Sequence, residues 1–538
     1  MSSRHNAARR EFLKLAATSM GAAGMSASIA EILIGSIYNR AYAATGAKSF
    51  YIHFTMPGGP PRWYFDQVQN PHGVTSDYIK GGFGNFIQGG SGVATAIHKN
   101  FKFTNGGKTY YLPPVWAYPR SGDKAVDLLQ HTQMFRGVDM QINNHALSNK
   151  RQVAPVIGGY SITGRMADAS SLPLSSVVAA TRGVGNPAGD AYRSLRSPAA
   201  APAILDKGAN PLQALMRPFR PREKSDLNDA NWQRAMADAL GELDNYAYDI
   251  GVRPTAMTNA YDKAIDLITS GKFDVFKSWS ATHKRYQDAV SEALAMASIQ
   301  RMFTEAVRAD GSDKFGISSR GVKANSRDLR NLFAGSPAIN GFADAFALAE
   351  IMVTENITSS VVMPLGPISG LSADGRAVQV THDQHGFGAV PSVMITSTYY
   401  RAMVNCLQEL VGQLKKAKVF DETVIHIGSE FSRTPRANGS GSDHGFYGAS
   451  STIISGKISK FGLIGNIHKK GERTSSDQYT GTWGRAANFG DFRRAIFVQD
   501  IANTICNMLG VSAVSENGIL LLNPSRNYEP NVKELKNV

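Results

Sequence analysis

Residues 423–445 read TVIHIGSEFSRTPRANGSGSDHG, and this stretch gives the strongest indication of the fold. Its start, 423–427, has the length and the β-branched composition of a buried strand. Glu430 follows, and after a basic turn and a loop rich in glycine and serine come Asp443 and His444. Open α/β sheets bind ligands at the carboxyl ends of their strands. The pattern predicts a metal site at that edge, and the alternative is a strand and a polar loop with satisfied hydrogen bonds.

A second pair of candidate ligands precedes this stretch. Asp383 and His385 follow a predicted strand at 359–365 by one loop. In an extended segment the two side chains project to the same side, so the pair can deliver one oxygen and one nitrogen to one ion. On spacing alone, a purely structural role is the alternative.

Segments of strand character alternate with segments of helical spacing along the chain. We expect strands at 48–55, 131–138, 359–365, 423–427 and 452–455, and helices at 232–248, 256–268, 276–307, 342–354, 392–417 and 499–509. Such alternation predicts an α/β fold, with a mostly parallel sheet covered by helices on both faces. Residues 44–538 are expected to form one such domain. The helical region 225–345 is either an insertion that caps the site or an ordinary packing layer.

The N-terminus has the features of an export signal. Arg9 and Arg10 form a twin-arginine pattern, a stretch rich in Ala, Gly and Ser follows, and residues 41–43 read AYA, a small-x-small cleavage site. We predict that residues 1–43 direct the chain to the twin-arginine translocase and are removed after Ala43. The mature protein would then be periplasmic or secreted. The alternative is an amphipathic N-terminal helix.

The charge balance indicates anionic partners. The full chain carries a formal net charge of +14, and removing residues 1–43 takes away five basic and two acidic residues, which leaves +11. This balance favours anionic small molecules or polyanions. There is no dense run of Lys and Arg and no basic stripe interleaved with aromatic residues, so nucleic-acid binding is not expected. After the signal no run of ~20 apolar residues appears, so we expect no stable membrane span.

The chain has two cysteines, Cys406 and Cys506, each in a segment of helical character. A cysteine metal cluster is excluded by this count. Buried free thiols are the expected state, although an oxidising compartment would permit one disulfide.

The stretch from Glu430 to Arg436, with Asn438 and then 443–445, resembles the signature of an exported bacterial family of unknown function. That family belongs to the alkaline phosphatase-like/sulfatase superfamily, and its usual pattern is a strand, Glu-Phe-Gly-Arg-Thr-Pro, a glycine-rich loop and Asp-His-Gly. A twin-arginine signal is typical of it. The resemblance is close over about 375–460 and thinner over 48–60 and 130–165.

The resemblance implies an alkaline phosphatase-like fold in which acidic residues and histidines at strand ends hold one or two divalent ions. It implies five metal ligands, namely Asp383, His385, Glu430, Asp443 and His444. Zn²⁺, Mg²⁺ and Ca²⁺ are not distinguished by these residue types. Arg433 would bind an oxygen of an anionic substrate through its guanidinium, or else pair with Glu430 or a loop carboxylate. His145 is a further candidate for the substrate site.

The chain also departs from the family pattern. Ser432 replaces the usual glycine, and Gln384 replaces a small hydroxyl residue. The Gly58-Gly59 turn lacks the acidic residue that family members commonly carry there, and the next carboxylate is Asp66.

No catalytic nucleophile can be assigned from the sequence. Thr55 and Ser148 lie near the appropriate strand ends, but neither belongs to a recognisable motif, and the Cys-x-Pro-x-Arg element of sulfatases is missing from the sequence. Two functions therefore stay open. One is an exported metal-dependent hydrolase of phosphate or sulfate esters. The other is a non-catalytic member of the same fold that binds a polyanion, a glycan or an envelope protein.

Overall fold

The computed structural model describes residues 49–68, 78–79, 98–99, 101–116, 125–142, 144–170, 172, 176–179, 203–205, 275–295, 317–319, 322–324, 338–339, 341–366, 368–369, 371–373, 376–378, 389–435, 442–445, 447–468, 472–473, 479–480, 485–531 and 535–536. The predicted signal peptide at 1–43 and the predicted helices at 232–248 and 256–268 lie outside these residues. Asp383 and His385 lie outside them as well.

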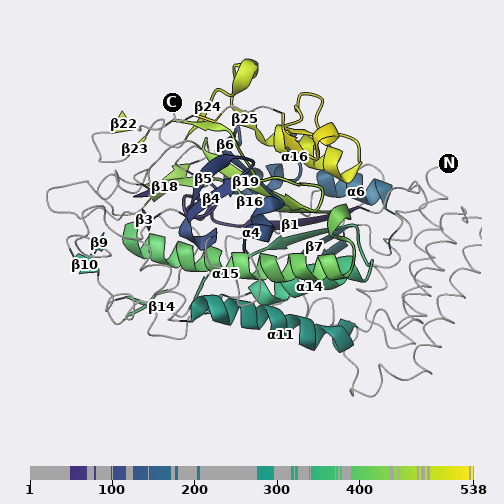
Figure 1. Cartoon of the computed structure of the whole chain (residues 1–538), viewed down its shortest axis with the longest axis horizontal. Helices are drawn as coiled ribbons and strands as arrows, with labels where there is room; N and C mark the ends of the chain where they lie inside the picture. Colours follow the sequence, from purple (N-terminus) through teal and green to yellow (C-terminus); the bar gives the residue numbers. More distant parts are fainter. Residues whose placement is uncertain are drawn as a thin grey trace, which may run out of the picture.

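The central sheet has the strand order β20-β6-β19-β16-β1-β12-β7-β8, with β25 paired to β6 (Figure 1). Its strands are β1 (Phe50–Met56), β6 (Thr132–Asp139), β7 (Val177–Ala179), β8 (Ala203–Leu205), β12 (Ser360–Pro364), β16 (Thr423–Ser429), β19 (Ala449–Ser455), β20 (Gly462–Ile464) and β25 (Ile496–Phe497). β19 is antiparallel to both of its neighbours, β16 and β6. The other described pairings of this sheet are parallel. The expected mostly parallel α/β sheet is confirmed.

Each of the five predicted strands is found in this sheet. The largest difference is at β19, which begins at Ala449 where the β-branched pattern indicates 452. Residues 449–451 are small and lack that pattern, and the register against β6 shifts between Ala449 and Ser450. Pairing with β6 therefore extends the strand beyond what local composition indicates.

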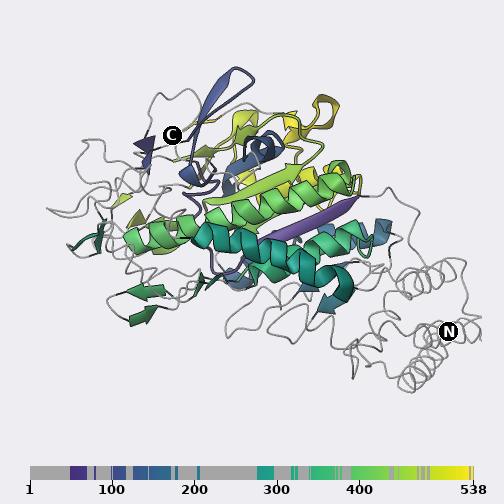
Figure 2. The ribbon, with the colours of Figure 1, turned by 60° about the horizontal axis from the view of Figure 1, so that its bottom comes forward.

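Helices cover both faces of the sheet (Figure 2). One face carries α14 (Phe342–Thr354) and α15 (Ala389–Lys416), with α11 (Val275–Leu294) packed against both. The other face carries α6 (Ile162–Ala169) and α16 (Val498–Leu509). α11 falls within the predicted helical region 225–345 and packs against α14 and α15. Within the described residues, no helix is both long enough and apolar enough to cross a bilayer.

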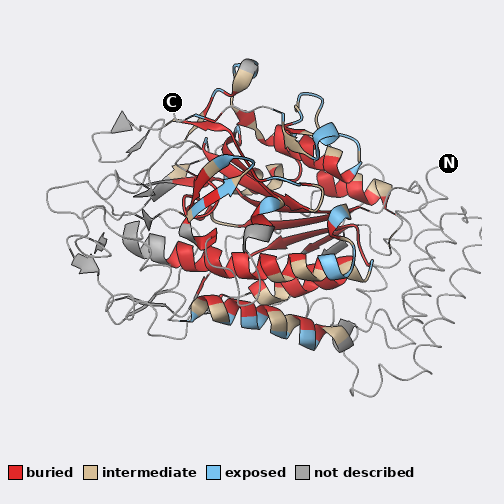
Figure 3. Ribbon diagram, in the orientation of Figure 1, coloured by how far each residue is buried: buried red, intermediate tan, exposed pale blue. Residues whose placement is uncertain are grey.

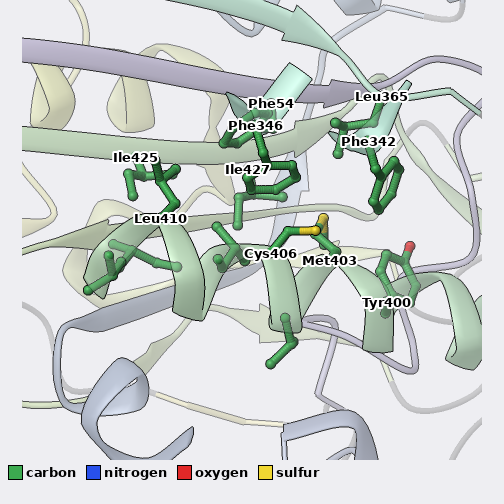
Figure 4. Packing of buried hydrophobic residues seen from close by; sticks show 14 of the residues in the cluster. Phe54, Phe342, Phe346, Leu365, Tyr400, Met403, Cys406, Leu410, Ile425 and Ile427 are labelled. Atoms are coloured by element: carbon green, nitrogen blue, oxygen red, sulfur yellow. The ribbon is translucent and has the colours of Figure 1, made fainter. Parts of the chain in front are cut away.

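Adjacent apolar side chains of each central strand belong to the hydrophobic clusters on opposite faces of the sheet, as the two-residue period of a β-strand requires. In β1, Ile52 and Phe54 belong to the cluster under α14 and α15, whereas Tyr51 belongs to the cluster under α6 and α16. Figure 4 shows Cys406 of α15 packed close to Ile427 of β16 in the first cluster. Figure 3 shows the sheet and the middle of α15 buried and the outer side of α11 partly exposed. The burial of both faces explains why β1 (FYIHFTM) and β12 (SVVMP) carry apolar residues on both sides of the strand.

Both cysteines are free and buried. Cys406 lies on α15 and Cys506 on α16, in the hydrophobic clusters on opposite faces of the sheet. The sheet between them prevents a disulfide, so the expectation of buried free thiols is confirmed.

Short elements complete the described structure. The remaining described α-helices are α4 (Ala125–Gln130) and α5 (His145–Arg151), and there are short 3-10 helices at Pro114–Trp116, Phe420–Glu422, Gly490–Phe492 and Pro524–Arg526. The two-stranded sheets are β2 (Tyr78–Ile79) with β3 (His98–Lys99), β4 (Phe101–Asn105) with β5 (Lys108–Leu112), β9 (Ile317–Ser319) with β10 (Val322–Ala324), β11 (Ala338–Ile339) with β13 (Ile368–Ser369), β14 (Leu371–Ala373) with β15 (Arg376–Val378), β17 (Ser432–Pro435) with β18 (Ser442–Gly445), β21 (Asn466–Ile467) with β24 (Ala486–Ala487), β22 (Glu472–Arg473) with β23 (Tyr479–Thr480), and β26 (Leu522–Asn523) with β27 (Glu529–Pro530). Of these, α5 and the β17–β18 hairpin contain residues of the candidate site described below.

Candidate metal and anion site

Four segments meet at the carboxyl edge of the sheet. β1, β6 and β16 run in the same direction, so the residues that follow them emerge at one edge. Gly58 follows β1, Glu430 follows β16, and His145 opens the helix after β6. The β17–β18 hairpin returns the chain to the same edge, and His444 lies on it just before β19. The order and direction of the strands therefore place residues from distant parts of the chain at the same edge of the sheet.

Glu430 lies at the centre of this edge and is fully buried. Its Oε1 accepts hydrogen bonds from the backbone N–H of Gly58, at 2.9 Å, and from Nδ1–H of His145, at 2.5 Å. Its Oε2 accepts a hydrogen bond from the side-chain amide of Asn149. Burial raises the pKa of Glu430, and the hydrogen bond from His145 opposes that rise. Three donors therefore fix this carboxylate in position.

His145 connects Glu430 to His444. Its Nδ1 faces the carboxylate, and its Nε2 lies 3.0 Å from Nε2 of His444. The two imidazole rings meet edge to face, with centroids 4.5 Å apart. His145 stands at the start of α5, whose N-cap is the side chain of Asn144. This cap fixes the helix start and thereby the direction of the His145 ring.

Two imidazole nitrogens at this separation either share one proton or direct their lone pairs at a common cation. A carboxylate that holds the other ring nitrogen is the usual support of a metal-binding histidine. Within the described residues, no group of three or more Asp, Glu, His or Cys side chains surrounds one point. The reason is geometric, because Glu430 contacts the side of His145 opposite to His444.

Glu430 thus contacts His145 directly, and Nε2 of His145 and Nε2 of His444 are the candidate atoms for coordination of an ion. Of the other three residues predicted as ligands, Asp443 is placed only by its backbone, which pairs with Thr434 in the β17–β18 hairpin. Asp383 and His385 are outside the described residues.

Asn149 is a member of the site that the sequence patterns did not reveal. Its carboxamide oxygen accepts hydrogen bonds from the Thr55 hydroxyl, at 3.3 Å, and from Nε2 of Gln152, at 3.0 Å, while its amide nitrogen holds Glu430. The available signal is helical spacing. His145 and Asn149 are four residues apart on α5, so they lie on one face of the helix and reach the same carboxylate.

A buried polar layer continues from Asn149 into the sheet. His53 and His426 are paired across β1 and β16, with their rings stacked at 4.3 Å. Nδ1 of His426 lies 2.9 Å from the Tyr51 hydroxyl and its Nε2 lies 2.8 Å from the Ser451 hydroxyl. Desolvation lowers the pKa of His53 to about 3 and holds the pKa of His426 well below its ordinary value. Both histidines are therefore neutral at physiological pH.

Arg433 contacts backbone carbonyls. It is buried, and its guanidinium donates hydrogen bonds to the carbonyl oxygens of Gly58 and Gly59, the latter at 2.7 Å. Gly59 adopts a left-handed φ of +59°, and a Cβ there would lie 2.4 Å from the Phe431 ring. Arg433 thus holds the glycine turn that presents the Gly58 N–H to Glu430. Its positive charge also opposes the rise that burial causes in the pKa of Glu430.

Asp66 belongs to a separate buried network. Arg62 forms a salt bridge with Asp66, and the hydroxyls of Ser450 and Thr452 each donate to it at 2.7 Å. These donors occupy both carboxylate oxygens. Asp66 therefore serves as the partner of a buried arginine, and it does not supply the acid that the Gly58-Gly59 turn lacks.

The two hydroxyl residues considered as nucleophiles are buried. Thr55 is fully buried and donates to Asn149. Ser148 is also fully buried, with its hydroxyl 3.5 Å from the carbonyl oxygen of Ile142. Neither is positioned to attack a substrate from this arrangement.

An exposed aromatic residue follows His444 closely. Tyr447 is 43% exposed, and the guanidinium of Arg485 lies 4.4 Å from the centre of its ring. A hydrogen bond from the Ala486 N–H to the Tyr447 carbonyl, 2.5 Å long, fixes the two segments side by side. Arg485 is thus a partly exposed cation beside Tyr447, three residues after His444, in contrast to the buried Arg433.

Fold and site together define an α/β protein in which a buried carboxylate and two histidines meet at the carboxyl edge of a mostly parallel sheet. Residues 371–482 match the model of a family described as "Protein of unknown function (DUF1501)". The matched segment contains the β17–β18 hairpin and α15, while His145 and Asn149 lie before it. No curated protein and no solved structure matches the chain.

Proposed function

We propose that this protein is an exported, metal-dependent hydrolase of phosphate or sulfate esters with an alkaline phosphatase-like fold. One observation carries the proposal. Nε2 of His145 and Nε2 of His444 lie 3.0 Å apart, and a buried carboxylate holds the far side of His145. This is the arrangement in which an outer carboxylate orients a metal-binding histidine.

In the proposed site, His145 and His444 hold a divalent ion through Nε2. Asp443, Asp383 and His385 complete the donor set with oxygen and nitrogen atoms suited to such ions. A bound ion supplies Lewis-acid polarisation of the ester oxygen and a more acidic water. The acidic residue missing from the Gly58-Gly59 turn favours a site with fewer bridging carboxylates than the superfamily pattern.

Glu430 keeps His145 in the tautomer with the proton on Nδ1, so Nε2 presents its lone pair. Asn149 and the Gly58 N–H prevent the carboxylate from rotating away. Because Thr55 and Ser148 are buried, we propose attack by water without a covalent enzyme intermediate. Arg485, stacked on Tyr447, is the candidate that attracts the anionic group of the substrate.

The second candidate function is a non-catalytic protein that binds a polyanion, a glycan or an envelope protein through the same edge. The burial of both hydroxyl residues favours it. So does the use of Arg433 on backbone carbonyls, which removes one expected contact to a substrate anion.

The test begins with metal analysis of the purified chain from residue 44 onwards. We expect a stoichiometric divalent ion, which His444→Ala removes. His283→Ala is the matched control, because His283 is a partly buried histidine on α11 that pairs with Asp344, and this variant should keep the ion. The proposal fails if the ion is missing from the wild-type chain after purification in metal-containing buffer.

Turnover of an aryl phosphate and an aryl sulfate then separates the two functions. The hydrolase requires turnover of at least one of them that His444→Ala abolishes and His283→Ala retains. A bound ion with no turnover of either ester would favour the non-catalytic binding protein.

A further inference from the structure

The loop that joins α5 to α6, residues 154–161, has a hydrogen-bonded base and an exposed tip. Its base is closed by a hydrogen bond of 2.8 Å from the Ile162 N–H to the Val153 carbonyl, and both residues are buried in the core. Its tip is a turn closed by a hydrogen bond of 3.0 Å from the Gly159 N–H to the Val156 carbonyl. Gly158 has a φ of +75°, which suits glycine at the third position of a type II turn.

The tip of this loop exposes three large hydrophobic side chains. Val156 is 39% exposed, Ile157 58% and Tyr160 37%. They are half of the six exposed large hydrophobic residues in the described part of the chain, and they fall within five consecutive positions. Single exposed hydrophobic residues are common on protein surfaces. A group of them on one exposed turn indicates a binding surface for a protein or a membrane.

Basic residues lie in the two helices that flank the apolar tip. The guanidinium of Arg165 on α6 lies 3.5 Å from the centre of the Tyr160 ring and is tethered by a hydrogen bond to the Ala513 carbonyl. Lys150 and Arg151 form the last turn of α5 immediately before the loop. Between residues 145 and 170 the chain carries three basic residues and one acidic residue, Asp168. The charge around the tip is therefore complementary to an anionic surface.

We propose that residues 154–161 dock the protein on the surface of a bilayer that contains anionic lipids. Val156 and Ile157 enter the boundary of the acyl chains. Tyr160 lies at headgroup depth, where aromatic residues with a polar end are favoured. Arg165 and Lys150 face lipid phosphates, and each basic residue near such a surface strengthens binding. Apolar insertion combined with basic contacts is how peripheral proteins bind membranes reversibly. This inference does not depend on the proposed hydrolase activity.

The direct test is co-sedimentation with vesicles. The chain starting at Ala44 holds every described residue and lacks the apolar N-terminal segment, which could bind lipid itself. We expect it to pellet with vesicles of phosphatidylglycerol and phosphatidylcholine mixed, and much less with phosphatidylcholine alone. Ile157→Glu should weaken binding roughly tenfold or more, because it removes the burial of one large aliphatic side chain.

Phe492→Glu is the matched control, because Phe492 is 44% exposed and lies outside the loop. It should bind vesicles as the wild type does. A second reporter is Ile157→Trp, whose fluorescence should shift to the blue when anionic vesicles are added and return when salt is raised, because salt screens the basic contacts.

Three outcomes would overturn the proposal. They are no pelleting with anionic vesicles, equal pelleting with phosphatidylcholine alone, and equal weakening by Phe492→Glu and Ile157→Glu. A loop that binds a protein partner would produce the first outcome.

Discussion

Nε2 of His145 lies 3.0 Å from Nε2 of His444, although the two residues are 299 positions apart in the chain. His145 reaches this point at the start of a helix that follows β6, and His444 reaches it on a hairpin that precedes β19. β6 and β19 are neighbours in the sheet, so strand pairing brings the two histidines together. The contact between the two histidines therefore depends on the pairing of β6 with β19, and local sequence does not specify it.

If the proposed metal site exists, removing the carboxylate behind His145 weakens metal binding without eliminating it. Glu430→Gln keeps the side-chain shape but loses the charge that favours the Nδ1–H tautomer. Mutation of such supporting groups typically reduces metal affinity about 10–100-fold. Competition with a chromophoric chelator measures the change, and the exposed Glu516→Gln provides the control. Affinity that is unchanged in Glu430→Gln would contradict the supporting role.

Asn149→Ala should destabilise the fold and disturb the site together. The substitution removes the hydrogen bonds that the Asn149 carboxamide makes with Oε2 of Glu430, with the Thr55 hydroxyl and with Nε2 of Gln152. Leaving buried polar groups unsatisfied costs roughly 1–3 kcal/mol. Urea unfolding of the variant should show this loss, whereas Asn517→Ala, at an exposed position, should unfold like the wild type. A loss below about 0.5 kcal/mol would argue against a tightly bonded Asn149.

Stability should fall as pH decreases below the ordinary histidine pKa of about 6.5. Burial depresses the pKa of His53 to about 3 and lowers that of His426, so the folded state keeps both neutral while the unfolded state takes up protons. The contribution is complete above pH ~6.5 and is lost on acidification at about 1.4 kcal/mol per pH unit for each group.

Urea titrations at pH 7.5, 6.0 and 5.0 measure this slope. His53→Gln removes one titrating group from the polar layer, so its slope should be shallower than that of the wild type by roughly 1 kcal/mol per pH unit. Equal slopes for the two proteins would show that His53 does not supply the linkage.

Gly59→Ala should be clearly more destabilising than Gly106→Ala. The two glycines have nearly the same left-handed φ, +59° and +58°, so the backbone penalty, about 1 kcal/mol, is shared. A Cβ at Gly59 meets the Phe431 ring at 2.4 Å, whereas a Cβ at Gly106 has nothing within 4 Å. Overpacking should add a further ~1–3 kcal/mol at Gly59 alone. Chemical denaturation of both variants tests the difference, and equal losses would contradict the close packing of Phe431 on the turn.

Local sequence was sufficient to predict the scaffold. The β-branched run at 423–427 and the helical spacing at 342–354 have periods that local sterics and burial impose, and β16 and α14 form there. The sequence pattern also singled out Glu430, which directly follows β16, and His444, which follows Asp443 on β18. The role of Asn149 was not visible, since its importance depends on a partner 281 residues away.

The sequence alone thus determined the layered α/β architecture, the helical setting of the two cysteines, and the acidic and imidazole groups that follow the strands. Tertiary structure decided what those groups do. It placed Glu430 behind His145, tied Arg433 to the backbone of a glycine turn and joined Asp66 to Arg62. Periodicity and propensity act over a few residues, whereas the partner of a buried polar group is set by strand order and desolvation across the whole sheet.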